Sequence, residues 1–276
     1  MSSHFIVAPG HGDLLRRVGI TDLEAALGHR GGRVLVQGKS SFIRILNDPD
    51  DVARQVYLKV YLYPKLGARW RYAFKKSRAE REFESAFLLI ERGLPAAAPL
   101  AHGSRRGSFG QLEASFVATL GVPRTVNLDA ILAADADPSA PLADPRLRRR
   151  GLEILGGLVG RMHQSGYVDH DLHWRNILVN LDSGVPAFTF IDSPKGEVPR
   201  ARSALVAGVV HDLASIDKHA PTRFTPRERA RFAVAWQREA TRFSLRRLRP
   251  IVMAEIDSLQ KKRARKLAAD AREGGT

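Results

Sequence analysis

The stretch from Tyr167 to Val179 constrains this chain more than any other part of the sequence. It contains Asp171 and, five residues later, Asn176, and an apolar run follows at once. This order is typical of the catalytic loop of enzymes that transfer a phosphoryl group. In such a loop Asp171 accepts the proton of the attacking hydroxyl, and Asn176 holds a Mg²⁺ ion on the nucleotide phosphates. A single D-x-x-x-x-N match is common by chance, so this interpretation depends on the other segments.

The composition indicates a folded protein with a strongly basic surface. The 276 residues are enough for one large domain or two closely packed lobes. The formal net charge of +15 attracts polyanions such as nucleic acid, anionic lipid and phosphorylated glycan. Most of the excess lies in four runs, at residues 65–78, 146–150, 246–249 and 261–266. We therefore expect an anionic partner, and an anionic membrane surface would hold such a protein peripherally.

Several classes of protein are disfavoured. No apolar segment approaches the roughly 18 residues that a membrane span requires, and residues 1–13 lack the basic start and apolar centre of a secretory signal. The absence of Cys removes disulfides and thiolate chemistry. Together these features favour a cytoplasmic location.

Residues 33–63 alternate between apolar and polar side chains as a β-sheet does. Three strands are predicted there, and a small turn of Gly38, Lys39 and Ser40 separates the first two. This arrangement is typical of the sheet that covers the nucleotide in a kinase. We therefore assign Gly38, Lys39 and Ser40 to the nucleotide phosphates, although the turn lacks a G-x-G-x-x-G pattern.

Lys59 lies in the third of these strands, where an unpaired ammonium group would be costly to bury. We expect it to contact the α- and β-phosphates and to pair with a carboxylate of the next helix. The alternative is a position on the solvent face of an edge strand. The helix is predicted over residues 77–92. Glu82 is the preferred partner because its side of that helix turns inward, and Glu84 is the second candidate.

Residues 61–76 interleave aromatic and basic side chains. This pattern suits an amphipathic surface that meets an anionic, partly apolar partner. A platform on which nucleic-acid bases stack would look similar. The sequence leaves both interpretations open.

The second half of the chain is predicted to be mainly helical, with two short strands after the loop. The second of these strands ends at Asp192, the position of a second metal-binding carboxylate. Asp212 is expected either to hold the catalytic-loop backbone or to cap a helix that begins near it. The other predicted segments are a strand at 112–120, a hinge at 121–123, a loop or insertion at 134–145, and helices at 146–165, 225–243 and 250–271.

The order of these residues resembles the lipopolysaccharide kinase (Kdo/WaaP) family, a branch of the protein-kinase-like fold. The resemblance extends from about residue 34 to residue 236 and depends on Lys59, Asp192 and the segments 81–95, 171–178 and 211–214. It implies a bilobal α+β fold. Residues 1–120 would form a small lobe with an antiparallel sheet and one helix, and residues 121–276 a larger, mainly helical lobe with a basic C-terminal helix.

The resemblance also implies an activity, namely transfer of the ATP γ-phosphate to a sugar hydroxyl of the lipopolysaccharide inner core at the cytoplasmic membrane face. Lys59 and Glu82 would then position the phosphates, Asp171 would be the base, and Asn176 and Asp192 would hold Mg²⁺. His173 lies two residues after the base. Sugar and small-molecule kinases of this fold often carry His there, whereas protein kinases usually carry Lys.

Two positions depart from the wider fold. Asp169 stands two residues before the base, where His is usual, so the packing that orients the loop must differ. Ser193 and Pro194 follow Asp192 where protein kinases have Phe and Gly, which disfavours an activation switch of the protein-kinase type.

Three other interpretations remain open at this point. A kinase of small soluble molecules, of the aminoglycoside phosphotransferase type, is disfavoured because a basic surface repels a polycation. A catalytically inactive module that binds an anionic glycan, lipid or RNA is disfavoured because the candidate catalytic and metal-binding residues are all retained, and nucleic acid is the less favoured partner. A metal hydrolase is weakly supported, because the spacing of its candidate ligands fits no usual pair on one helix; these are His163, His170, His173 and His211.

Overall fold

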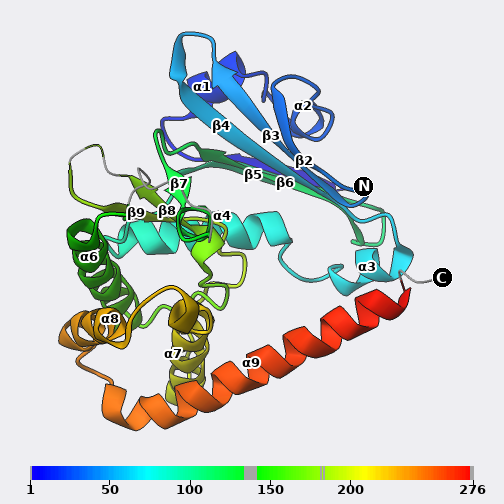
Figure 1. The fold of residues 1–276 in the computed structure, drawn as a ribbon. Coiled ribbons are helices and arrows are strands. Elements are labelled where there is room, and N and C mark those ends of the chain that lie inside the picture. The colour runs from blue at the N-terminus through cyan, green and yellow to red at the C-terminus, as the bar shows by residue number, and fades with distance from the viewer. Residues whose placement is uncertain (1, 134–141, 181, 183, 274–276) are drawn as a thin grey trace. The chain divides into compact units, whose positions relative to one another are not determined.

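The chain folds into two compact units that combine helices with antiparallel strands, as the computed structural model in Figure 1 shows. The structure describes residues 2–133, 142–180, 182 and 184–273. Unit 1 consists of Met1–Thr125 together with Thr189–Lys195, and unit 2 of Val126–Phe188 together with Gly196–Thr276. The α+β fold class predicted from the sequence is confirmed. The predicted lobe boundary at residue 120 stays a prediction.

Unit 1 is built on a six-stranded antiparallel sheet of order β1-β5-β6-β4-β3-β2. The predicted strands are confirmed, and two more, β1 and β5, join them. Neither has the alternating pattern of β-branched residues that marks a strand in sequence, and they form an antiparallel pair with each other. The strands are β1 (Ser2–Val7), β2 (Arg33–Gln37), β3 (Ser41–Asp48), β4 (Asp51–Leu62), β5 (Pro99–Arg106) and β6 (Leu112–Leu120).

Strand β4 lies inside the sheet, between β3 and β6. Val56, Leu58 and Val60 are fully buried on one face, where α1 (Gly12–Arg17) and α2 (Leu23–Leu27) complete the core. Successive side chains of a strand point to opposite faces, so Lys59 points to the other face. Lys59 therefore does not lie on an edge strand, and that alternative is wrong.

The face of the sheet that carries Lys59 is covered by α4 (Arg78–Glu91) (Figure 1). Ser77 caps this helix, because its hydroxyl accepts a hydrogen bond of 3.0 Å from the Glu80 N–H. Phe83 then packs against Val117 of the sheet. The predicted helix is confirmed. Unit 1 also contains three short helices that were not predicted, namely α1, α2 and α3 (Leu66–Arg71).

Unit 2 consists mainly of helices, with the strands β7 and β8 and residues 187–188 of β9; the other two residues of β9 belong to unit 1. No helix in the described part of the chain combines the length and the apolar character needed to cross a bilayer. The elements are β7 (Val126–Asn127), α5 (Leu128–Ile131), α6 (Pro145–Gln164), the 3₁₀ helix η1 (Trp174–Asn176), β8 (Ile177–Asn180), β9 (Ala187–Phe190), α7 (Arg202–Asp217), the 3₁₀ helix η2 (Ala220–Thr222), α8 (Pro226–Glu239) and α9 (Leu245–Glu273).

Two helix boundaries differ from the prediction. Helix α7 begins at Arg202, not near His211, because Ala201 provides no side-chain cap and the buried helix lacks a polar stripe that would reveal its period. Helix α9 begins at Leu245 and continues through Pro250, where the prediction placed its start. The expected loop at 134–145 lies largely outside the described residues, and Pro145 is the first residue of α6.

Glycines allow α6 and α8 to approach each other closely. A Cβ atom added to Gly156 would lie 2.4 Å from the Phe232 carbonyl oxygen, and one added to Gly160 would lie 2.6 Å from the Trp236 carbonyl oxygen. Backbone atoms cannot move aside as a flexible side chain can. Gly157 has no such neighbour, since the nearest atom to its added Cβ is Glu239 Cγ at 3.9 Å.

The contrast between these glycines predicts opposite effects of the same substitution. Gly160→Ala should lower the free energy of unfolding by about 1–3 kcal/mol because the added methyl group pushes the helices apart. Gly157→Ala should raise it by about 0.5–1 kcal/mol through helix propensity. Urea denaturation measures both values. An unchanged or raised free energy of unfolding in Gly160→Ala would contradict the close approach at Gly160.

His102 of β5 predicts a pH dependence of stability. Its buried ring lies 4.5 Å from that of Phe83 and 5.3 Å from that of His4, centroid to centroid, and within the described structure its Nδ1 has no hydrogen-bond partner. Burial lowers the pKa of His102 from 6.5 to about 4, and the nearby charges of His4 and Lys76 add to the shift.

The unfolded chain therefore binds a proton at His102 before the folded chain does, so acidification favours unfolding. Between pH 6.5 and pH 4 this effect should remove about 2 kcal/mol of the free energy of unfolding. His102→Gln should reduce that loss in urea titrations, whereas His11→Gln serves as the control. An identical pH profile for His102→Gln and the unsubstituted protein would show that His102 is not the group responsible.

Candidate active site

Lys59 is held in unit 1 by two carboxylates. Its Nζ lies 2.6 Å from Glu82 Oε1 and 3.2 Å from Asp192 Oδ1. Burial alone would lower the pKa of Lys59, but the two negative charges outweigh it and raise that pKa, so the side chain stays an ammonium ion. Glu84, the second candidate partner, forms an ion pair with Lys76 on the exposed side of the helix. Glu82 is thus the carboxylate that contacts Lys59.

Glu82 is itself buried and has a second donor. The Tyr61 hydroxyl donates a hydrogen bond of 3.0 Å to Glu82 Oε2, while Lys59 occupies Oε1. Burial raises the pKa of Glu82, and the Lys59 charge and both hydrogen bonds oppose that rise. Burial also raises the pKa of Tyr61, so its hydroxyl remains a donor. Both oxygens of Glu82 are therefore used to hold Lys59 in place.

Asp192 follows β9 in a backbone conformation that non-glycine residues rarely adopt, with a φ of 58°. Two hydrogen bonds hold the chain before it, from the Phe190 N–H to the Pro95 carbonyl (2.8 Å) and from the Ala97 N–H to the Phe190 carbonyl (3.1 Å). Asp192 Oδ1 is buried and, within the described structure, accepts no hydrogen bond of regular geometry. This oxygen instead forms the ion pair with Lys59. Strain and an underused oxygen together are typical of a functional position.

The loop around Asp171 closes on itself in unit 2. The His173 N–H and the Asn176 side-chain amide both donate to the Asp171 carbonyl oxygen, at 2.8 and 2.9 Å. His173 Nε2 lies 3.3 Å from Asp171 Oδ1. The Trp174 indole anchors the loop to α7 through a hydrogen bond of 2.8 Å to the Ile216 carbonyl. The sequence motif is therefore one turn of backbone whose polar side chains converge on Asp171.

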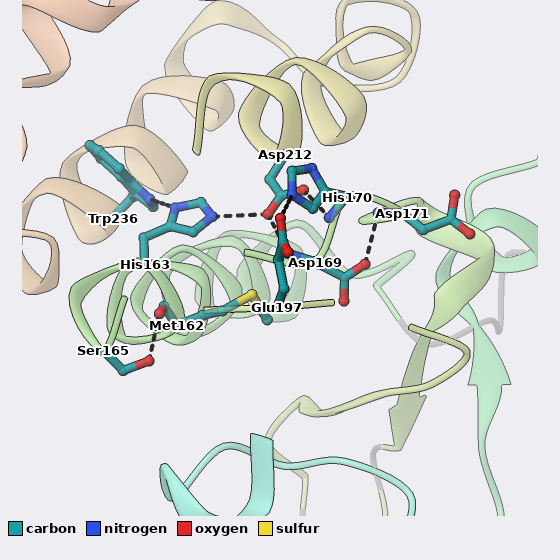
Figure 2. Close-up of polar contacts among 9 residues, drawn as sticks. All are labelled: Met162, His163, Ser165, Asp169, His170, Asp171, Glu197, Asp212 and Trp236. Atoms are coloured by element: carbon teal, nitrogen blue, oxygen red, sulfur yellow. Dashed lines mark hydrogen bonds and ion pairs between the residues drawn. The ribbon is translucent and has the colours of Figure 1, made fainter. Parts of the chain in front are cut away.

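Asp212, in the last part of α7, fixes the chain just before Asp171 (Figure 2). Its two carboxylate oxygens accept the N–H groups of Asp169 and His170, each at 2.8 Å. His170 has a φ of 58°, a left-handed conformation that needs such support. Asp212 is fully buried and lies inside its helix. Of the two expectations for Asp212, the one in which it holds the catalytic-loop backbone is confirmed.

Two further residues complete the support of Asp212, and the sequence does not predict this role for either of them. His163 Nε2 lies 3.4 Å from Asp212 Oδ2, and the Trp236 indole donates a hydrogen bond of 2.9 Å to His163 Nδ1 (Figure 2). Since Nδ1 accepts, Nε2 carries the proton and donates to Asp212. All three side chains are fully buried. A His on the apolar side of α6 is the only signal of this role in the sequence.

Asp169 explains how the loop is built without the His that is usual at this position. Its Oδ1 accepts a hydrogen bond of 3.0 Å from the Asp171 N–H. His170 points elsewhere, and its Nε2 lies 3.3 Å from Glu197 Oε1. The candidate base is therefore fixed through its own backbone by the residue two positions earlier.

The remaining predicted residues are placed as follows. Gly38, Lys39 and Ser40 form the exposed turn between β2 and β3, and the Gly38 N–H closes it on the Ser41 carbonyl at 2.8 Å. Their role toward a nucleotide stays a prediction. Within the residues that the structure describes, no three His, Asp or Glu side chains gather in a geometry that could hold a metal ion.

Two predicted ligands have the chemistry that Mg²⁺ requires. Asp192 presents a carboxylate whose buried Oδ1 lies 3.2 Å from Lys59 Nζ and accepts no regular hydrogen bond within the described structure. The Asn176 amide nitrogen is committed to the Asp171 carbonyl, so the other terminal atom of its side chain is the oxygen. Carboxylate and amide oxygens are hard ligands of the kind Mg²⁺ binds. The two residues fit the ion, and their joint use as ligands stays a prediction.

Weakening the hydrogen bonds to Asp212 should loosen the backbone at Asp169 and His170. Asp212→Asn keeps the size of the side chain but replaces one accepting oxygen by a donor, so one backbone N–H loses its acceptor. The free energy of unfolding should fall by about 1–3 kcal/mol, and amide hydrogen exchange at Asp169 and His170 should accelerate.

Asp217→Asn is the matched control, because Asp217 lies in the same helix and pairs with Arg229 in a partly exposed position. It should cost about 1 kcal/mol or less and leave exchange at Asp169 and His170 unchanged. Equal exchange rates in the two variants would contradict the role of Asp212.

Comparisons with known proteins agree with this geometry. A solved structure of WaaP in complex with acyl carrier protein has the same fold, with a TM-score of 0.64 and 20% identity over 96% of this chain and 99% of that chain. The lipopolysaccharide core heptose(I) kinase WaaP of Pseudomonas aeruginosa is 28% identical over 165 residues, which are 59% of this chain and 55% of that protein. The alignment thus spans about half the length of this relative. The model of the lipopolysaccharide kinase (Kdo/WaaP) family matches residues 24–236, and the chain belongs to that family.

Proposed function

We propose that this protein transfers the γ-phosphate of ATP to a sugar hydroxyl of the lipopolysaccharide inner core. The observation that carries the proposal is the buried contact of Lys59 with Glu82 and Asp192. An ammonium ion held between two carboxylates, one of them strained and underused, is costly unless it serves binding or catalysis. Membership of the family supports a sugar of the lipopolysaccharide core as the acceptor.

Each residue has a role that follows from its chemistry. Lys59, held by Glu82, contacts the α- and β-phosphates. Asn176 and Asp192 would hold Mg²⁺, which when bound neutralises charge on the phosphates. Gly38, Lys39 and Ser40 cover the nucleotide from the turn between β2 and β3.

Asp171 is proposed as the base, with His173 as the residue that orients it. Lys218 Nζ lies 3.3 Å from His173 Nδ1. A Lys ammonium ion only donates, so Nδ1 accepts and the proton of His173 is on Nε2, facing Asp171 Oδ1. The Asp171 carboxylate then accepts the proton of the sugar hydroxyl. The hydroxyl oxygen bonds to the γ-phosphorus, and the bond from that phosphorus to ADP breaks, so ADP leaves.

Substitution of Asp171 tests the base. Asp171→Ala should reduce phosphoryl transfer to purified core by about 10²–10⁴-fold, because the carboxylate proposed to take the hydroxyl proton is removed. Binding of ATP, measured by equilibrium dialysis, should persist. Transfer at the unsubstituted rate would exclude Asp171 as the base.

The two Lys–Glu pairs of α4 provide a matched test of the nucleotide site. Lys59→Met should raise the KM for ATP and lower kcat, because the phosphates lose their positioning charge. Lys76→Met removes the same charge from the exposed pair with Glu84 and should leave both constants unchanged. If the two variants behave alike in steady-state assays, the assignment of Lys59 is wrong.

We also propose that the protein binds peripherally to the inner face of the cytoplasmic membrane through the segment 61–76. Leu66, Trp70 and Phe74 expose large apolar surfaces, and the Phe74 side chain is 91% exposed. Arg69 and Arg71 lie between them in sequence, and Lys65 and Lys75 flank them. Arg106 fixes the end of this segment through hydrogen bonds to the carbonyls of Tyr72, Ala73 and Lys75. Apolar groups within a basic surface suit the boundary between headgroups and acyl chains of an anionic membrane.

Vesicle binding tests this surface. The double variant Trp70→Ala/Phe74→Ala should bind phosphatidylglycerol vesicles at least about tenfold more weakly in sedimentation assays. Ile251→Ala/Met253→Ala, which removes exposed apolar side chains from α9, is the control. Equal affinity of both variants and the unsubstituted protein would exclude this segment as the membrane contact.

A further inference from the structure

A basic cavity of about 680 Å³ lies in unit 2 beside the catalytic loop. Residues of η1, the end of α7, η2 and α9 line it together with Asp129. Among the lining residues, Asp129 is the one that carries a carboxylate. Five carry permanent or near-permanent positive charge, namely Arg175, Lys218, Arg223, Lys262 and Arg263.

The cations of this basic cavity are poorly neutralised. Within the described residues, ion pairs with carboxylates are absent for four of them, Lys218, Arg223, Lys262 and Arg263. Lys218 instead contacts His173, and Arg263 lies 3.2 Å from His219 Nε2. Burial lowers the pKa of Lys218, and the charges of Arg175 and Arg263 lower it further. The cations therefore repel one another, and an anion in the cavity would relieve that repulsion.

A buried hydroxyl adds a neutral donor to the lining. Ser215 of α7 is 2% exposed, and its Oγ has no hydrogen-bond partner within the described structure. Buried hydroxyl groups are normally paired, so an unpaired one in the wall of a cavity indicates a position where a partner is to be supplied.

The basic cavity is connected to the candidate base by direct contacts. Lys218 touches His173 Nδ1, and the opposite ring nitrogen, Nε2, touches Asp171 Oδ1, both at 3.3 Å. One imidazole ring thus separates Lys218 from the carboxylate that receives the hydroxyl proton, and Arg175 lies 3.9 Å from Asp171 Oδ1. An anionic group bound by these cations would therefore lie close to a hydroxyl that is placed at Asp171.

We propose that the basic cavity binds an anionic group of the sugar acceptor, a carboxylate or a phosphate, and thereby places a neighbouring hydroxyl at Asp171. The inference rests on the proposed function and adds the chemical class of the acceptor. Lys218 is a positioning residue in this account, whereas Arg223, Lys262 and Arg263 contact the anion.

The test uses the full chain and the double variant Arg223→Gln/Arg263→Gln. Arg246→Gln/Arg247→Gln, which removes two exposed charges from α9 outside the cavity, is the matched control. Acceptors are deacylated lipopolysaccharide core, the same core with its carboxylates reduced to alcohols, and the same core after phosphatase treatment. Deacylation removes any contribution of membrane binding. Lys262→Gln provides an independent variant if the double variant fails to fold.

The expected result is a loss of kcat/KM for the native core of at least about tenfold in the double variant, as for charge-assisted contacts, with the KM for ATP unchanged. The control should match the unsubstituted protein. Removing the recognised group from the core should lower the kcat/KM of the unsubstituted protein by a similar factor. It should not lower the kcat/KM of the double variant any further. The modified core that shows this pattern identifies the anion as carboxylate or phosphate.

Two results would overturn the inference. One is an unchanged kcat/KM for the native core in the double variant. The other is a double variant that loses kcat/KM by the same factor, relative to the unsubstituted protein, on the native core and on both modified cores. If the unsubstituted protein transfers phosphate to no core at all, the proposed function fails, and calorimetric binding of the native core without ATP then decides the cavity separately. Weaker binding by the double variant than by the control would support the cavity, and equal binding or no binding by any of the proteins would refute it.

Discussion

The candidate catalytic loop depends on the hydrogen bonds that the buried carboxylate of Asp212 accepts. A fully buried charge is unfavourable unless donors surround it, and Asp212 receives two backbone N–H groups and the ring of His163. Those bonds support the left-handed backbone at His170 and so fix the position of the Asp171 backbone that follows it. The arrangement requires α6, α7 and α8 together, because His163 comes from the first and Trp236 from the third. The glycines at 156 and 160 make that close packing possible.

Unit 1 also contains a buried charge, the positively charged ammonium group of Lys59. Lys59 is buried on an interior strand, and the face it occupies is covered by α4, so its charge has to be met by carboxylates within that unit. Glu82 pairs with Lys59 through Oε1 and accepts the Tyr61 hydroxyl at Oε2, whereas Asp192 meets Lys59 through Oδ1 alone, at 3.2 Å and without a regular hydrogen bond. Glu82 is therefore suited to position Lys59, whereas Asp192 has bonding capacity left for a ligand.

Local signals made part of this predictable from sequence. Ser77 and the inward side of Glu82 are visible in the pattern of one helix, and the Asp171–Asn176 spacing lies within one loop. Features that depend on packing were not predictable. His163 and Trp236 lie far apart in sequence and meet only through α6 and α8. Helix α7 shows no cap or polar stripe. The cations of the basic cavity come from separate segments of the chain. Each segment alone has the pattern of a solvated surface, and the fold brings their side chains together around one cavity.

The central claim is that the protein phosphorylates a sugar of the lipopolysaccharide core. Mass spectrometry of deacylated core after incubation with the protein, ATP and Mg²⁺ tests it most directly. We predict one added phosphoryl group on a core sugar and formation of ADP in equal amount. Formation of ADP without any change in the core, or phosphorylation of soluble sugars or proteins in preference to the core, would contradict the claim.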